Sequence, residues 1–98
     1  MVKQIRWANE ANETFETMTA YLHDEFTLNT ATKFADSVYA QIDKLILYPE
    51  IGQTSPKDSS IRSVKVNKNV VMFYHYDGFE ILIVDFFNTR QDPNKRKY

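Results

Sequence analysis

The segment from Val70 to Pro93 constrains the fold of this chain more than any other part of it. It reads VVMFYHY-DG-FEILIVDFFNTRQDP, so two runs of β-branched and aromatic residues flank Asp77-Gly78. An Asp-Gly pair between two such runs is the strongest short-range signal for a tight β-hairpin. We therefore expect two antiparallel strands, Val70–Tyr76 and Phe79–Phe87, followed by a polar cluster at residues 88–93.

The turn also predicts which residues face each other in this hairpin. A two-residue turn at Asp77-Gly78 places Tyr76 opposite Phe79 and His75 opposite Glu80. With this register one face carries only apolar residues, and we expect that face to pack against helices; it consists of Val71, Phe73, Leu82, Val84 and Phe86.

The turn before the hairpin leaves two registers open. A two-residue turn at Asn67-Lys68 adds Val64 and Val66 to the helix-facing side and leaves Lys65, Val70 and Asp85 on the open side. A three-residue turn at residues 67–69 inverts the assignment for the strand that begins at Val70.

The first half of the chain predicts one strand and two helices. Residues 3–7 alternate in polarity as a strand does. Residues 9–26 and residues 30–48 each carry an apolar stripe at helical spacing, with a short break at residues 27–29 between them and Pro49 after the second stripe. Helices joined by so short a break form an antiparallel hairpin. The apolar stripes are Ala11, Phe15, Met18, Leu22 and Phe26, and then Ala31, Phe34, Ala35, Val38, Ile42, Leu45 and Ile46.

Residues 49–60 predict a long polar loop, and residues 61–66 predict one further strand. Together these elements predict an α+β fold with an N-terminal strand, a helical hairpin and a three-stranded antiparallel meander, the helices lying on one face of the sheet. Ninety-eight residues form one domain, here residues 1–98.

Composition excludes several classes of site. The chain has no cysteine, which excludes disulfides, zinc sites built on thiolates and a thiol nucleophile. Two glycines are too few for a glycine-rich phosphate loop, and the two histidines, His23 and His75, lie in different predicted elements. We therefore expect no metal and no cofactor. No apolar run reaches the ~20 residues that span a bilayer, and we expect a cytoplasmic protein with no membrane partner.

Charge is distributed unevenly along the chain. Residues 1–60 carry five cations and nine acids, 5 − 9 = −4, whereas residues 61–98 carry seven cations and four acids, 7 − 4 = +3. In metal-free RNA cleavage, cations stabilise the phosphorane while an acid and a base transfer protons. Lys65 and Arg90 could supply the cations, and Tyr74, His75 or Tyr76 the proton transfer, but the spacing fixes no acid–base pair. The cationic candidates are Arg62, Lys65, Lys68, Arg90 and Lys95-Arg96-Lys97.

The order of these elements resembles the RelE/ParE superfamily of bacterial type II toxins. The resemblance extends from Ile5 to Pro93 and is carried by PEIG after the second helix, IRSVKV, VVMFYHYDG and FFNTRQDP. It implies a small α+β toxin and a cognate antitoxin, whose disordered C-terminal segment folds onto the toxin to give a hetero-oligomer. We expect some apolar surface to remain exposed as the docking groove for that antitoxin.

Within this superfamily the resemblance implies two mechanisms. RelE-like members cleave messenger RNA on the ribosome through lysines, arginines and a C-terminal tyrosine or histidine on the open sheet face, whereas ParE-like members lack that set and poison DNA gyrase. Lys65 and Arg90 lie near basic positions of the nucleases, but Val71 stands where they often carry arginine, and Tyr98 is expected beyond the sheet.

The RQDP ending and the net charge of −1 favour the ParE-like branch. The hypothesis is a toxin that binds gyrase through cationic residues and is neutralised by its antitoxin. The alternatives are a RelE-like ribosome-dependent mRNA endoribonuclease, with Lys65 and Arg90 as catalytic residues, and a degenerate interaction module without toxicity. The predicted target-binding residues are Arg62, Lys65, Arg90, Lys95 and Arg96.

Overall fold

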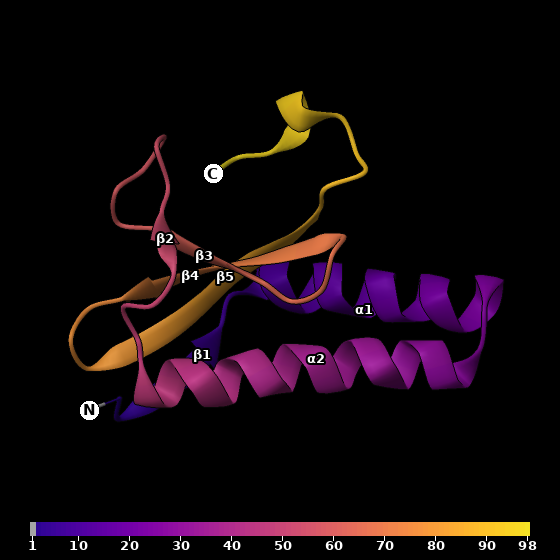
Figure 1. Cartoon of the computed structure of the whole chain (residues 1–98), viewed down its shortest axis with the longest axis horizontal. Coiled ribbons are helices and arrows are strands. Elements are labelled where there is room, and N and C mark those ends of the chain that lie inside the picture. Colours follow the sequence, from indigo (N-terminus) through magenta and orange to yellow (C-terminus); the bar gives the residue numbers. More distant parts are fainter. Residues whose placement is uncertain (1) are drawn as a thin grey trace.

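A computed structural model of the protein, which describes residues 2–98, contains a sheet covered on one face by two antiparallel helices (Figure 1). The predicted α+β order of one strand, a helical hairpin and a meander is confirmed. The elements are β1 (Gln4–Trp7), α1 (Asn9–Glu25), α2 (Leu28–Leu47), β2 (Gln53–Thr54), β3 (Arg62–Lys65), β4 (Val70–Tyr76), β5 (Glu80–Asn88) and the short 3-10 helix η1 (Pro93–Lys95).

The helical hairpin forms where the apolar stripes predicted it. The break between α1 and α2 supplies an N-cap, because the hydroxyl of Thr27 accepts a hydrogen bond of 3.1 Å from the amide of Thr30. Most of the predicted stripe of α2 is buried against the sheet, although Ile46 at the end of that stripe is exposed. The buried residues of this helix are Ala31, Phe34, Val38, Ile42 and Leu45.

The sheet has five strands in the order β1-β5-β4-β3-β2. The edge strand β1 pairs with β5 in parallel, and every other neighbouring pair is antiparallel. Two elements were not predicted: β2 lies inside the segment 49–60 that was expected to be loop, and η1 follows the polar cluster after β5.

The predicted two-residue turn at Asp77-Gly78 is wrong. Tyr76 pairs with Ile81 and not with Phe79, so residues 77–80 form a longer connection. The carboxylate of Asp77 accepts hydrogen bonds from the amides of Phe79 and Glu80, at 2.9 and 2.7 Å, and Gly78 has a φ of 92°. These side-chain bonds stand beside one backbone bond of the turn, from the amide of Asp77 to the carbonyl of Glu80 at 3.3 Å.

The predicted assignment of the sheet faces is also largely wrong. Val71, Phe73 and Val84 lie on the face away from the helices, and only Phe86, Val64 and Val66 contact the helix side as predicted. The residues of β4 and β5 that are buried under the helices are Val70, Met72, Tyr74, Ile81, Ile83 and Phe86.

A β-bulge and a turn explain this difference. Tyr74 pairs with Ile83 but Phe73 pairs with Asp85, so Val84 is an extra residue in β5. Without the bulge, Asp85 would continue the buried row of Ile81 and Ile83; with it, Phe86 takes that place. The turn before β4 is the three-residue alternative over residues 67–69, since the amide of Val66 donates to the carbonyl of Val70 at 2.9 Å.

Candidate target-binding site

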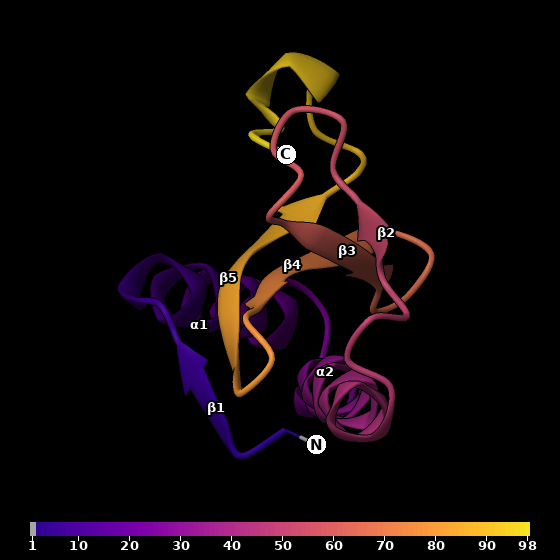
Figure 2. The same ribbon diagram turned by 90° about the vertical axis from the view of Figure 1, so that its left-hand side faces the viewer.

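The face of the sheet away from the helices carries a second, smaller apolar cluster. Figure 2 shows that the C-terminal segment and the loop before β3 lie on this side of the sheet, opposite the helices. We call this the open face. Its buried residues are Ile61, Val71, Phe73 and Phe87, and Val84 and Tyr98 pack against them.

The C-terminal segment, residues 89–98, folds back over the open face. The ring of Tyr98 contacts the ring of Phe73 edge-on, with 5.2 Å between centroids, and the guanidinium carbon of Arg96 lies 5.2 Å from the same centroid. Phe73 thus makes an aromatic pair and a cation–π contact with this segment. The expectation that Tyr98 lies beyond the sheet is therefore wrong.

Three of the predicted cationic residues lie around one end of the sheet. Lys65 is exposed at the end of β3, where it pairs with Val71. Lys68 lies in the next turn, and this turn is bonded to the segment that carries Arg90, because the amide of Thr89 donates to Asn69 at 2.7 Å. We call Lys65, Lys68 and Arg90 the cationic rim.

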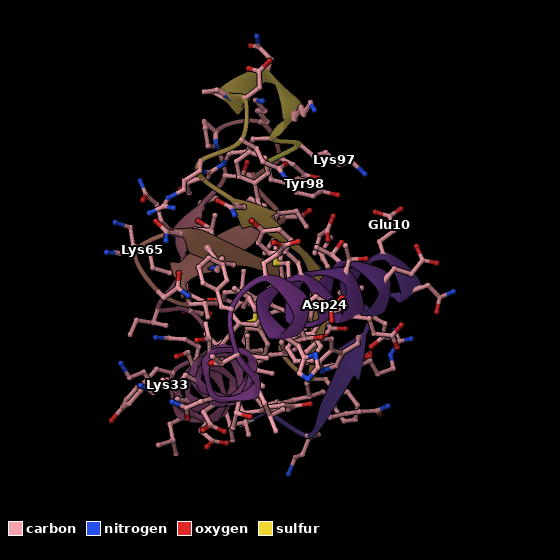
Figure 3. All side chains as sticks on the ribbon, turned by 90° about the vertical axis from the view of Figure 1, so that its right-hand side faces the viewer. Glu10, Asp24, Lys33, Lys65, Lys97 and Tyr98 are labelled. Carbon is pink, nitrogen blue, oxygen red and sulfur yellow. The ribbon has the colours of Figure 1, made fainter. Side chains whose placement is uncertain are left out.

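The remaining predicted cations belong to the C-terminal segment. Lys95 is exposed in η1, whose first turn is capped by the carboxylate of Asp92. Arg96 is half-buried on Phe73. Figure 3 shows Lys97 beside Tyr98, on the side that faces Glu10 of α1, and the two charged groups approach to 3.4 Å.

Arg62 lies apart from the other predicted target-binding residues. Its guanidinium donates two hydrogen bonds of 2.9 Å to the carbonyls of Glu50 and Gly52. In the ladder between β3 and β4, Arg62 pairs with Tyr74, and the side chain of Tyr74 lies under the helices. These contacts hold the loop after α2 in place.

Tyr74 completes this anchor and accounts for the PEIG sequence. Its hydroxyl donates to the carbonyl of Pro49 at 2.8 Å and accepts from the amide of Gly52 at 2.9 Å, while burial raises its pKa. A Cβ at Gly52 would lie 2.6 Å from that hydroxyl, so only glycine fits there. This role was not predicted, because the expected register placed Tyr74 on the open face; a buried tyrosine needs a polar partner for its hydroxyl.

The proton-transfer candidates do not converge on the open face. Tyr74 is buried under the helices, and the Nδ1 of His75 lies 2.7 Å from the carbonyl of Ser60. The expected pairing of His75 with Glu80 is wrong, because His75 pairs with Leu82 and Glu80 contacts Arg6. Among residues 2–98 no three His, Asp or Glu side chains are grouped as metal ligands. In the same part of the chain, no helix combines the length and apolarity needed to cross a membrane.

An aromatic groove lies beside the edge strand β1. It has a volume of about 630 Å³ and is lined by Trp7, Phe15 and Tyr39, with Arg6, Asn12 and Glu16 at its polar positions. Trp7 contacts both Phe15 and Tyr39, with ring centroids 5.3 and 6.2 Å apart. Large apolar side chains therefore remain accessible next to an unpaired strand edge, as expected for a docking surface.

Several solved structures share this fold. They include the chromosomal ParDE toxin–antitoxin system from P. aeruginosa, with a TM-score of 0.74, 15% identity, and coverage of 89% of this chain and 96% of that chain. A YoeB/ParE toxin from Agrobacterium tumefaciens has a TM-score of 0.64 and 10% identity, covering 87% and 96% of the two chains. YafQ from E. coli strain BL21(DE3) has a TM-score of 0.58 and 7% identity, covering 90% and 94%.

Sequence comparison is decisive at the level of the family. No curated protein sequence is significantly similar to this chain. The family model described as the ParE toxin of the type II toxin–antitoxin system parDE matches residues 5–93, which is nearly the whole domain. The chain therefore belongs to the ParE toxin family and is the toxin component of a type II toxin–antitoxin system.

Proposed function

We propose that this toxin arrests growth by binding DNA gyrase, with the cationic rim and the C-terminal segment making the contact. Support comes from the family match and from the exposure of Lys65, at the end of β3, and of Arg90 and Lys95, in the segment after β5. With a net charge of −1, the chain lacks the general basic character that binding to ribosomal RNA favours.

The observation that carries this proposal is the chemistry of the open face. Its centre is the apolar cluster around Phe73, and Tyr98 and Arg96 lie on that cluster. A cleaving site needs a positioned acid and base beside the phosphate. Here the hydroxyl of Tyr74 lies under the helices and His75 is engaged with a backbone carbonyl, which favours binding over RNA cleavage.

A supercoiling assay with purified gyrase and the full chain tests the proposal. We expect inhibition of supercoiling and accumulation of cleaved DNA complexes, and Arg90→Ala and Lys65→Ala should weaken both. Lys33→Ala is the matched control, because Lys33 lies on α2, far from the C-terminal segment (Figure 3). Normal supercoiling at saturating toxin would refute a gyrase-directed activity.

The second candidate function is ribosome-dependent mRNA cleavage. It is favoured by one observation, the position of Tyr98 on the open face beside Phe73. Primer extension on translated mRNA after toxin induction distinguishes it from the first. Defined cuts that disappear in Tyr98→Phe and Lys65→Ala would establish the nuclease and replace gyrase as the target.

The aromatic groove is the proposed binding place of the antitoxin expected for this family. An extended antitoxin segment can pair with the free edge of β1 and place apolar side chains against Trp7, Phe15 and Tyr39. Glu16, which lines the groove, favours a basic side chain at its rim. Tyr39 is 53% exposed, so Tyr39→Ala should leave the fold intact and weaken antitoxin binding by roughly tenfold or more. An unchanged affinity would place the antitoxin elsewhere.

A further inference from the structure

Two residues of the loop before β3 contact the C-terminal segment through its backbone. The hydroxyl of Ser55 donates to the main-chain oxygen of Tyr98 at 2.7 Å, and the ammonium of Lys57 donates to the main-chain oxygen of Arg96 at 2.8 Å. Both bonds cross about forty residues of sequence. They join two segments that lie side by side above the open face (Figures 1 and 2).

Ser55 is buried, so its contact with the C-terminal segment is part of the packed structure. It is 6% exposed, and among residues 2–98 it is the one residue classed as both polar and buried. Its amide donates to the carbonyl of Ile61 at 2.8 Å, and its hydroxyl also accepts from the amide of Lys57 at 3.2 Å. One hydroxyl therefore orders the loop turn that carries Lys57 and holds the C-terminal segment at the same time.

These contacts act on the backbone, which leaves the side chains of the segment free for other contacts. Lys95 and Lys97 remain exposed, with the ammonium of Lys97 3.4 Å from the carboxylate of Glu10, while the main-chain oxygens of residues 96 and 98 are held. The ring of Tyr98 and the guanidinium of Arg96 lie on Phe73 and fix the other side of the segment. The arrangement limits the directions in which the exposed cations can point.

We infer that Ser55 and Lys57 form a clamp that positions the C-terminal segment for target binding. The clamp itself rests on the contacts above, and its functional consequence rests on the proposed role of this segment in binding gyrase. Ser55 and Lys57 are positioning residues in this scheme, because they act through the backbone of the segment and need not touch the target.

Limited trypsin digestion of the full chain tests the clamp without any target. Trypsin cuts after Lys95, Arg96 and Lys97, and a held segment is a poor substrate. In Ser55→Ala and Lys57→Met we expect these cuts to become roughly 3- to 10-fold faster, which is the effect of losing one hydrogen bond to the segment. Mass spectrometry of the digest measures the rate of each cut. Lys57→Arg keeps the donor and should restore protection.

Matched controls separate the clamp from general effects of each substitution. Ser59→Ala and Lys33→Met remove the same chemical groups from exposed positions, and both should be cut at the wild-type rate. Unchanged cutting in both Ser55→Ala and Lys57→Met would overturn the clamp.

The same variants in the supercoiling assay test positioning. We expect a 3- to 10-fold loss of inhibition, with unchanged antitoxin binding and with both helices still folded. Faster cutting with full inhibition would overturn the positioning role. Failure of the gyrase proposal is distinguishable, because wild-type toxin would then leave supercoiling intact while the digestion result stood.

Discussion

The two faces of the sheet are covered in different ways. On one face, α1 and α2 bury a continuous core that includes Met72 and Tyr74 of β4. On the other face, a short segment with little regular structure covers the neighbouring residues Val71 and Phe73. Alternate residues of one strand therefore serve two different purposes.

The contrast lies in what holds each cover in place. The helices are held by extensive apolar burial, which stabilises by about 25 cal/mol per Å². The C-terminal segment is held by Ser55, Lys57 and contacts with Phe73, each worth on the order of 1 kcal/mol. We expect the segment to open at a much lower free energy than the helices, as parts of proteins that bind partners commonly do.

The sharpest test compares adjacent positions of β4. Met72 is 0% exposed under the helices, and Met72→Ala should lower the free energy of unfolding by about 2–5 kcal/mol, because the core cannot close over the cavity. Val71 is 6% exposed on the open face, and Val71→Ala should cost about 1.5 kcal/mol.

Urea unfolding of both variants measures these two values. If Val71→Ala cost as much as Met72→Ala, the open face would be packed as rigidly as the core, and the contrast between the two covers would fail.

The next largest effect is expected from the hydrogen bonds that join Tyr74 of β4 to the loop after α2. Tyr74→Phe removes the acceptor for the amide of Gly52 and the donor for the carbonyl of Pro49, leaving both backbone groups without their partner. We expect a loss of about 1–3 kcal/mol in the free energy of unfolding. Hydrogen exchange should also rise at residues 50–53, because the loop then lacks its two hydrogen bonds to Tyr74. Wild-type exchange in this loop would show that Tyr74 does not anchor it.

A smaller effect is expected from the cover of the open face. Tyr98→Ala removes an aromatic contact with Phe73, which is worth about 0.5–1.5 kcal/mol. Exchange should rise on the open face while α1 and α2 keep their protection. Loss of helix protection in this variant would mean that the two covers unfold together.

The smallest effect concerns pH and the loop that supports the C-terminal segment. Hydrogen bonds from the hydroxyl and amide of Ser60, together with nearby His75, lower the pKa of Asp58. A carboxyl whose pKa is lowered by folding stabilises above its unfolded pKa, about 3.9, and loses that contribution as pH falls through the folded pKa. In acid, exchange in residues 55–60 should rise before the helices unfold. Asp58→Asn should flatten that dependence, and an unchanged profile would exclude Asp58 as its source.

Local sequence patterns predicted the elements well and the pairing poorly. The spacing of Phe34, Val38 and Leu45 set the buried side of α2 regardless of what it packs against. The hairpin register depended on the side chain of Asp77 and on the extra residue Val84, and neither changes the local propensity for strand. Choosing the uniformly apolar row as the core side failed because the three-residue turn at residues 67–69 places Val71 and Phe73 on the open face, and the bulge then moves Phe86 to the core side.

The candidate site shows the same division. The cationic character of the C-terminal half was visible in the sequence, including Lys65, Arg90 and Lys95. The sequence did not reveal that Arg62 bonds the loop after α2, or that Tyr98 returns to Phe73. These contacts join residues 10 to 25 positions apart, which local periodicity does not report.

The sequence by itself determined both helices, four of the five strands, their order along the chain and the family, because each follows from residue spacing or from motifs within short windows. Only the tertiary structure decided which face of β4 is core, which cations are exposed, and that Ser55 holds the backbone of Tyr98. The physical reason is that a β residue can face either side at similar local cost. Its side is chosen by partners distant in the chain, through bulges, turns and buried hydrogen bonds that form only when the whole domain packs.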